Sequence, residues 1–209
     1  MKLHSPLCDL FGIEYPIVLA GMGGASTPEL AAAVSNAGGL GVLGAAACQP
    51  EQLREWIQRT RALTDKPFGV DTLLPASVRR TAQTQGDGRA DPADQLADHL
   101  KFARDFMAQE ELPMPISHGG GQSVGGGNLQ VFSKEFFDAQ MQVIIEERVP
   151  VYAAGLGNPG PWMAELRYNG TRVMAVVGAV RHAIQVAAIG LDAIVAQGQY
   201  DNSIFHRVE

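Results

Sequence analysis

The sequence predicts an α/β fold in which short apolar strands alternate with amphipathic helices around a parallel sheet. Three observations support this prediction. The apolar runs lack polar alternation, which is typical of parallel strands buried on both faces. Residues that start and stop helices bracket the segments between these runs. Finally, strands beginning at Val151, Val173 and Ala193 recur every 20 to 22 residues, which indicates a βα repeat.

The chain is organised around its opening unit, residues 16–44. It contains an apolar strand at 16–20, a Gly-rich turn at 21–24, an Ala-rich helix, and a second apolar strand ending at Gly44. The turn has almost no side chains, so a flat or phosphorylated ligand could approach its backbone. It lies at the carboxyl end of a strand, where open α/β sheets and β/α barrels place their sites.

The helix of this unit has two possible starts. Ser26 and Glu29 have the spacing of a capping box, and Thr27 is an alternative cap with Pro28 at the first helical position. Four apolar residues fall at i, i+3, i+4 and i+7 and define one helical face: Leu30, Ala33, Val34 and Ala37.

The same reading assigns the other elements. We expect helices at 50–63 and 134–147, and a helix that Asn158 caps with Pro159 at its first position. A last helix should show the face Val180, Ala183, Ile184, Ala187 and Ala188 and stop at Gly190. The further strands are predicted at 68–71, 151–154, 173–177 and 193–196.

Six strands of βα type are therefore predicted, whereas a closed β/α barrel needs eight strands and about 250 residues. The chain is interpreted as one incomplete β/α-barrel domain over residues 1–209, a partial TIM barrel without strands seven and eight. An irregular insertion occupies about 75–148, with a helix near 91–107 and a glycine-rich run at 118–128. That run is typical of a mobile loop, and a phosphate cradle is the alternative.

Composition excludes several classes of function. The 209 residues are 46% hydrophobic and 18% charged, with a formal charge of −6 and a pI near 5.3. No basic stripe is present, which argues against a nucleic-acid partner. Two cysteines favour a reducing, cytoplasmic setting over a disulfide scaffold. No window approaches 18 apolar residues, so no membrane span is expected.

Two segments match the G-x-G-x-x-G pattern of dinucleotide-binding turns. The run Gly39, Gly41, Gly44 lies inside a strand, and the run Gly155, Gly157, Gly160 follows one. The strand after the second run ends at Val177-Gly178 without the acid that holds a ribose, which disfavours a Rossmann domain.

Polar residues close two of the predicted strands, Asp71 and Gln197. An apolar slot with carboxyl or amide groups and glycine turns suits a flavin ring; the alternative is that these residues only cap strand ends. The five histidines lack metal-ligand spacing. His182 is expected to be solvated or capping, and His118, in the glycine-rich run, is an open catalytic candidate.

Five segments together resemble the nitronate monooxygenase family, once called 2-nitropropane dioxygenases: residues 16–22, 26–41, 64–71, 153–160 and 192–198. The resemblance covers about residues 10–74 and 140–198. It implies a TIM-barrel flavoprotein that binds FMN at the carboxyl ends of its strands and oxidises alkyl nitronates with dioxygen. An FMN-dependent enoyl reductase branch looks similar.

The resemblance also implies site residues. Ala20, Gly21 and Met22 match the first flavin-contacting turn, with Gly21 in place of the usual Pro. Asp71 stands where many members carry Asn. Gln197 and Gly198 match the last two residues of the family's Ala-Gln-Gly motif.

After Gly198 the family continues with an acidic residue and an Ala-Gly-Gly-His run that supplies its catalytic His. Here residues 199–204 replace that run, and His206 does not align with the family's His. The chain is therefore interpreted as a shortened family member whose catalytic residue is unknown.

Two hypotheses follow. The first is an FMN oxidoreductase of nitronate monooxygenase type, whose activity the shortening impairs. The second is a non-catalytic remnant that persists as an interaction module. Under both, the apolar edge strands at 16–20 and 193–196 lack partners, so a homo-oligomer formed through these edges is expected.

Overall fold

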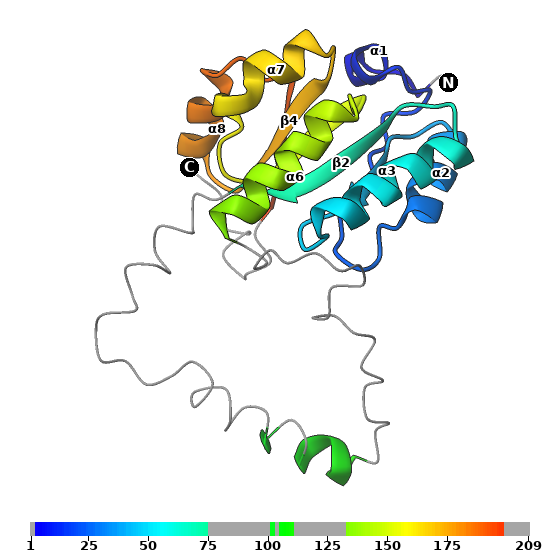
Figure 1. Ribbon diagram of the computed structural model, residues 1–209, viewed down its shortest axis with the longest axis vertical. Coiled ribbons are helices and arrows are strands. Elements are labelled where there is room, and N and C mark those ends of the chain that lie inside the picture. Colours follow the sequence, from blue (N-terminus) through cyan, green and yellow to red (C-terminus); the bar gives the residue numbers. More distant parts are fainter. Residues whose placement is uncertain (1–2, 75–100, 103–104, 111–132, 199–209) are drawn as a thin grey trace.

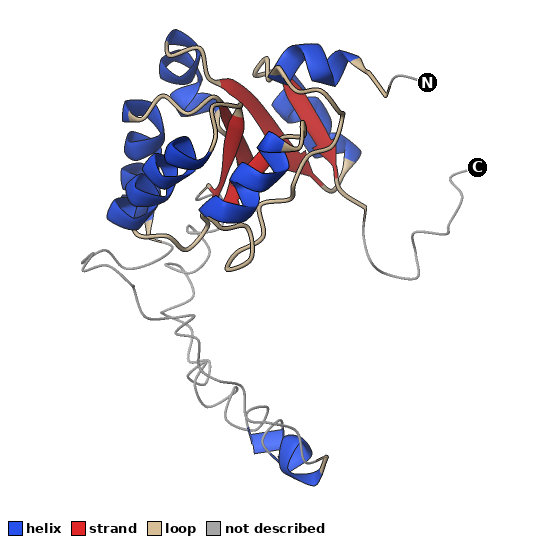
Figure 2. Cartoon of the chain, turned by 90° about the vertical axis from the view of Figure 1, so that its right-hand side faces the viewer, coloured by secondary structure: helices blue, strands red, loops and turns tan. Residues whose placement is uncertain are grey.

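The computed structural model describes residues 3–74, 101–102, 105–110 and 133–198. Within them, one sheet holds five parallel strands in chain order (Figures 1 and 2). The strands are β1 (Gly41–Gly44), β2 (Phe68–Leu73), β3 (Val151–Leu156), β4 (Arg172–Val177) and β5 (Ala193–Ala196). Sequential parallel strands joined through helices are the arrangement of a β/α-barrel wall, as predicted.

Five α-helices lie over one face of this sheet (Figure 1). They are α2 (Pro28–Asn36), α3 (Pro50–Leu63), α6 (Lys134–Glu146), α7 (Met163–Tyr168) and α8 (Val180–Ala187). The short helices α1 (Pro6–Phe11) and η3 (Gly160–Trp162) complete the described elements named here. The bounds of α3 are those that the sequence predicts, and α6 ends one residue earlier than predicted.

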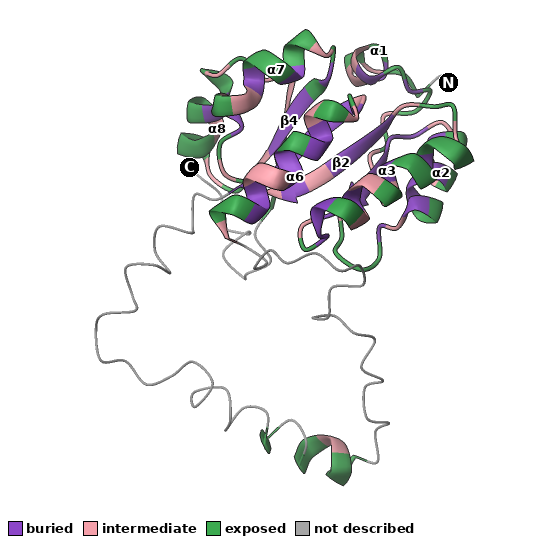
Figure 3. Cartoon of the chain, in the orientation of Figure 1, coloured by how far each residue is buried: buried purple, intermediate pink, exposed green. Residues whose placement is uncertain are grey.

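The strands and the helix sides that face them are largely buried (Figure 3), and successive strand residues contribute alternately to two cores, one on each face of the sheet. Leu43, Val70 and Tyr152 point to the helical face, where they pack against the covering helices. Val42, Ala153 and Met174 point to the opposite face, which we call the inner face, and pack there with Cys8 and Phe11 of α1, among others. Because the side-chain period of a strand is two, Asp71 and Gly155 also belong to the inner face.

A buried amide joins α6 to the carboxyl edge of the sheet. The Nε2 atom of Gln140 donates to the carbonyl oxygens of Ala45 and Cys48 at 2.9 and 2.8 Å. At the helix surface, Arg54 and Arg61 of α3 pair with Glu147. These contacts fix the helix between β2 and β3, so residues 134–146 are a regular part of the barrel wall.

The strand predicted at 16–20 is reduced to one parallel bridge, between Val18 and Leu40. The described sheet therefore has five strands where six were predicted. The chain turns away after Ala20, because its carbonyl oxygen accepts the Met22 N–H at 2.9 Å and the Ser26 hydroxyl at 2.7 Å. The bridge itself uses the Ile17 carbonyl and the Leu19 N–H, which both bond Leu40, so the Ala20 carbonyl points away from β1 and its bonds belong to the turn.

The capping box predicted for α2 is absent. Thr27, the alternative, occupies the N-cap position, with Pro28 at the first helical position and no side-chain cap bond. The predicted apolar face is also wrong, since the buried residues of α2 are Pro28, Ala31, Ala32 and Ser35. A Cβ on Gly41 would lie 1.8 Å from the Ala31 carbonyl oxygen, so the helix packs its small residues against a bare strand.

The last helical unit also differs in detail from the prediction. In α8 the buried residue is Val186, while Val180 and Ile184 are 78% and 67% exposed. Asn158 does not cap α7; its Oδ1 atom accepts the Gly160 N–H at 2.7 Å and closes the turn before η3. Gly190 ends the unit with φ +80°, as a helix stop requires.

Several predictions lie outside the described residues: the glycine-rich run 118–128 with His118, the tail 199–209 with His206, and most of the helix near 91–107. Of that helix, residues 101–102 and 105–109 are helical.

Candidate functional site

The turn that follows residue 20 crosses the carboxyl ends of β1 and β2. A Cβ added to Gly44 would lie 2.3 Å from the Met22 carbonyl oxygen, and one added to Gly21 would lie 2.3 Å from the Asp71 Cβ. The turn therefore rests directly on both strands. Glycine at these two positions is what permits the contact, since any side chain would separate the turn from the sheet.

Ser26 holds this turn in place. Its buried hydroxyl donates to the Ala20 carbonyl at 2.7 Å and accepts the Met22 N–H at 3.1 Å. Its own carbonyl accepts the Gly44 N–H at 3.0 Å. The sequence did not predict this role of Ser26, because its spacing to Glu29 indicated a helix cap. The pattern that could have indicated it is an apolar run followed by a Gly-rich turn.

The Asp71 carboxyl is clamped between the turn and β3. Its Oδ2 lies 2.4 Å from the position that a Cβ on Gly21 would take, and its Oδ1 lies 2.6 Å from that of a Cβ on Gly155. The Gly155 N–H hydrogen-bonds the carboxylate. Gly155 was read only as part of a glycine motif, and nothing in its spacing indicated a contact with Asp71.

Burial raises the pKa of Asp71 to about 7, and the hydrogen bond from Gly155 lowers it only in part. No ion pair involves Asp71 among the described residues. At neutral pH this carboxyl is therefore divided between its neutral and ionised forms. In the neutral form it offers an O–H donor.

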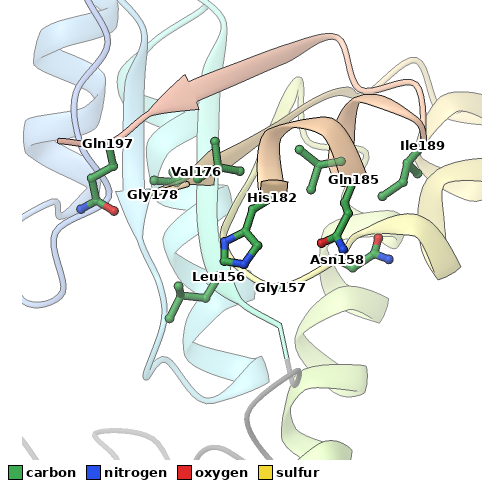
Figure 4. A pocket seen from close by; sticks show the side chains of 11 residues that line it. Leu156, Gly157, Asn158, Val176, Gly178, His182, Gln185, Ile189 and Gln197 are labelled. Atoms are coloured by element: carbon green, nitrogen blue, oxygen red, sulfur yellow. The ribbon is translucent and has the colours of Figure 1, made fainter. Parts of the chain in front are cut away.

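A second feature of the carboxyl edge is a pocket of about 570 Å³ between the ends of β3, β4 and β5 and the helix α8 (Figure 4). Leu156, Val177 and Ile189 contribute apolar walls, and Asn158 and Gln185 contribute amides. His182 also lines it and is exposed, with its Nε2 atom 3.3 Å from Nε of Arg181. Among the described residues, no Lys or Arg lines this pocket.

The structure divides the predicted site residues into two groups. Ala20, Gly21, Met22 and Asp71 meet at the ends of β1 and β2. Gln197 lies at the end of β5, lines the pocket and is exposed, and Gly198 follows it. Because β2 and β5 are three strands apart, roughly 14 Å separates the two groups across the sheet.

Open space surrounds three glycines along this edge. A Cβ on Gly23, Gly178 or Gly198 would meet nothing within 4 Å in the described structure. Packing does not require glycine at these positions, unlike Gly21, Gly44 and Gly155, so backbone is accessible from the carboxyl edge there.

Within the described ranges, no three His, Cys, Asp or Glu side chains converge to hold a metal ion. No helix of those ranges is long and apolar enough to cross a membrane.

Comparison with known proteins gives concordant results. The profile of the nitronate monooxygenase family matches residues 4–201. A nitronate monooxygenase of Paraburkholderia phytofirmans is 37% identical over 194 residues, which are 92% of this chain and 47% of that protein. A probable nitronate monooxygenase of Staphylococcus aureus is 30% identical over 193 residues, 92% of this chain and 48% of that one. The chain thus spans about half the length of the curated relatives it matches.

Two solved structures share the fold. FabK from Thermotoga maritima superposes with a TM-score of 0.60 at 34% identity, over 92% of this chain and 43% of that one. A nitroalkane oxidase from Streptomyces ansochromogenes gives a TM-score of 0.62 at 31% identity, over 93% and 48%.

Proposed function

This chain belongs to the nitronate monooxygenase family, and from that premise we propose that it takes part in the FMN-dependent oxidation of alkyl nitronates by dioxygen. The observation that carries the proposal is the contact of the turn at Gly21 with Asp71. It joins the two family segments that the resemblance assigns to the flavin, at the edge of the sheet where barrels of this kind place their sites.

The residues present fit a flavin ring in three respects. The turn after Ala20 presents backbone without bulk, and Gly23 faces open space. Asp71 provides an oxygen for the ring edge, and Gln197 provides an amide further along the same edge. FMN, when bound, would supply the redox chemistry that oxidation of a nitronate by dioxygen requires.

In this proposal each protein group has a defined task. Ser26 fixes the turn so that the peptide groups near Gly21 and Met22 keep one orientation toward the ring. Asp71 orients the ring edge through its carboxyl, and the apolar side chains of Leu156 and Val177 line the pocket that would receive a small aliphatic substrate.

Tight binding of the FMN phosphate is not part of the proposal. Barrels of this type bind phosphate with loops that follow strands seven and eight, and no cation lines the pocket in the described part of the chain.

An oxygen electrode tests the function. Purified chain with added FMN should consume dioxygen when an alkyl nitronate is supplied, and boiled protein with FMN should not. An enoyl substrate with a reduced nicotinamide tests the enoyl reductase alternative in the same sample. Absence of turnover with either, in folded protein saturated with FMN, would favour the non-catalytic remnant.

A reducing, cytoplasmic location suits this proposal, because Cys8 and Cys48 are free and buried.

A further inference from the structure

The described sheet has an open end at β5. This strand is the last in the sheet order and pairs with β4 alone, so one edge of its backbone has no strand partner among the described residues. All residues of β1 are buried, whereas Ile194 and Val195 of β5 are 40% and 39% exposed. An edge strand with exposed apolar side chains is a template for pairing with another strand.

The opening involves both faces of β5. Ile194 pairs in register with Ala175, which belongs to the core under the helices. Val195 pairs with Val176, which alternation places on the inner face, two residues after Met174. A helix laid over one face would leave the other face bare, so an element that covers this end must extend the sheet itself.

The helix before β5, α8, exposes its apolar face. Val180 and Ile184, which the sequence predicts on this face, are 78% and 67% exposed. Ala187 and Ala188 of the same face are also exposed. Elsewhere in the wall the next helix covers its neighbour, since α2 packs against α3 and α3 against α6. An exposed apolar stripe at helical spacing indicates a neighbour that is not among the described residues.

The apolar stripe of α8 faces away from α7. Gln185 and His182 line the pocket together with Asn158, which precedes α7 (Figure 4). At about 100° per residue, Val180 and Ile184 lie roughly 150° around the helix from these two side chains. The stripe is therefore directed toward the position that the helix of a next unit would take.

The exposed apolar residues of α8 and β5 form one surface, because the helix packs against the strand. We call this surface the open end of the wall, and its residues are Val180, Ile184, Ala187, Ala188, Ile194 and Val195. It combines a helix flank with a sheet edge, so an occupant must supply a helix and a strand together. A βα unit does this, and a barrel of this kind is completed by further βα units.

The relatives carry enough chain to supply such units. About half of each curated relative lies outside its match with this chain, which covers 47% and 48% of two of them. A second copy of this chain is the other candidate occupant. Related by a two-fold axis, it would bring its own β5 antiparallel to the first, whereas all described strand pairs are parallel. The strand direction therefore favours a βα unit.

We propose that the open end of the wall docks a second polypeptide that carries further βα units of the barrel. One strand of this partner pairs in parallel with β5, and the helix of the same unit packs its apolar stripe on Val180 and Ile184. Docking buries the exposed apolar side chains and satisfies the free edge of β5. The inference concerns assembly, and neither flavin binding nor turnover enters it.

Co-expression with a tagged probe tests the proposal on the full chain. The probe is the part of the Paraburkholderia phytofirmans nitronate monooxygenase that lies outside its match with this chain. Capture on the tag, followed by gel filtration, should return both polypeptides in one peak at equal stoichiometry. Ile184→Asp would bury an unpaired carboxylate in the interface and should reduce the captured chain about tenfold or more. Leu63→Asp alters a residue of α3 that is 45% exposed and should be captured like wild type.

Circular dichroism of the isolated variants separates docking from folding. Ile184→Asp should fold like wild type, because the side chain that it replaces is exposed; if it does not fold, Val195→Lys on the edge strand takes its place and should show the same loss of capture. The proposal is overturned if the wild-type chain is not captured, or if the folded open-end variant is captured as well as wild type. A homodimer of the wild-type chain that the probe does not displace would also overturn it and assign the surface to a second copy.

Discussion

Replacing Asp71 by Asn should stabilise the protein at alkaline pH and leave its stability unchanged in acid. Burial raises the pKa of this carboxyl from 3.8 to about 7 in the folded chain. Between these two values the folded state binds more protons than the unfolded state. Stability therefore falls as the pH rises through this window, and the loss is complete above about pH 7.

The size of the effect follows from the same two pKa values. A rise from 3.8 to about 7 corresponds to about 4 kcal/mol at 1.36 kcal/mol for each tenfold change in the proton equilibrium. The ionised carboxyl retains some solvent contact, so this is an upper bound. Asn keeps the volume and the oxygen that accepts from Gly155, and it removes the ionisation.

Urea denaturation of wild-type chain and D71N at pH 5 and pH 8 measures the effect. The free energy of unfolding of D71N relative to wild type should be larger at pH 8 by up to about 2.7 kcal/mol, because two pH units of the window separate the two conditions. Other titrating groups cancel in this comparison. Two outcomes would refute the account of Asp71. One is the same difference in the free energy of unfolding between D71N and wild type at both pH values, and the other is a wild type that is more stable than D71N at pH 8.

Three further predictions concern the packing and the edges. Gly41→Ala places a Cβ 1.8 Å from a carbonyl oxygen of α2 and should lower the free energy of unfolding by about 3 kcal/mol or more. Gly23→Ala has open space around the new Cβ and should change the melting temperature little. Equal melting temperatures for the two variants would contradict this packing. Ser26→Ala removes both hydroxyl bonds of the turn and should lower the free energy of unfolding by about 2 kcal/mol; a loss below about 0.5 kcal/mol in urea denaturation would show that the turn does not depend on them. Val195 of β5, at the edge of the described sheet, is 39% exposed, so we expect the chain to self-associate and Val195→Lys to reduce the association, as measured by light scattering. A wild type that stays monomeric at high concentration would argue against pairing through this edge.

The strands were predictable because burial on both faces leaves a direct record in the sequence. β2, β3 and β4 are largely buried apolar runs at the predicted places. β5 also lies where it was predicted, although its residues are mostly exposed in the described structure. The bounds of α3 were predictable for a similar reason, because Pro50 stands at its start and polar residues follow Leu63 at its end. Asp71 could be singled out because it is the polar residue that follows an apolar run, but β2 was predicted to end there and instead continues to Leu73.

The buried face of α2 was not predictable from hydrophobicity. The pattern selected Leu30, which is 38% exposed, because a large apolar side chain usually marks the core. Here Gly41 brings the helix so close to β1 that only small residues fit, and Ser35 is tolerated since its hydroxyl donates to the Pro67 carbonyl and accepts the Gly41 N–H. Backbone proximity, which leaves no periodic signal, decided the face.

The sequence selects candidate site residues one by one, but it does not predict the contacts between them. Asp71 and Gly21 were selected one by one, and the clamp between Gly21 and Gly155 depends on strand register, which a single sequence does not record. The role of Ser26 was hidden for a related reason, because a serine before a helix is equally suited to capping it. Gln197 was selected by motif, and its distance from Asp71 follows from the strand order.

The most direct test of the central claim is a titration of FMN into the purified chain, followed by quenching of flavin fluorescence. We expect saturable binding with a Kd weaker than about 1 µM, because the turn at Gly21 and Asp71 offers groups that suit a ring, while the described residues that line the pocket include no cation for a phosphate. Gly23→Ala, which fills the open space at the turn, should weaken it at least tenfold, while Glu51→Ala on the exposed face of α3 should not. Absence of saturable quenching in folded wild-type chain, or equal affinity in Gly23→Ala, would contradict a flavin site at this turn.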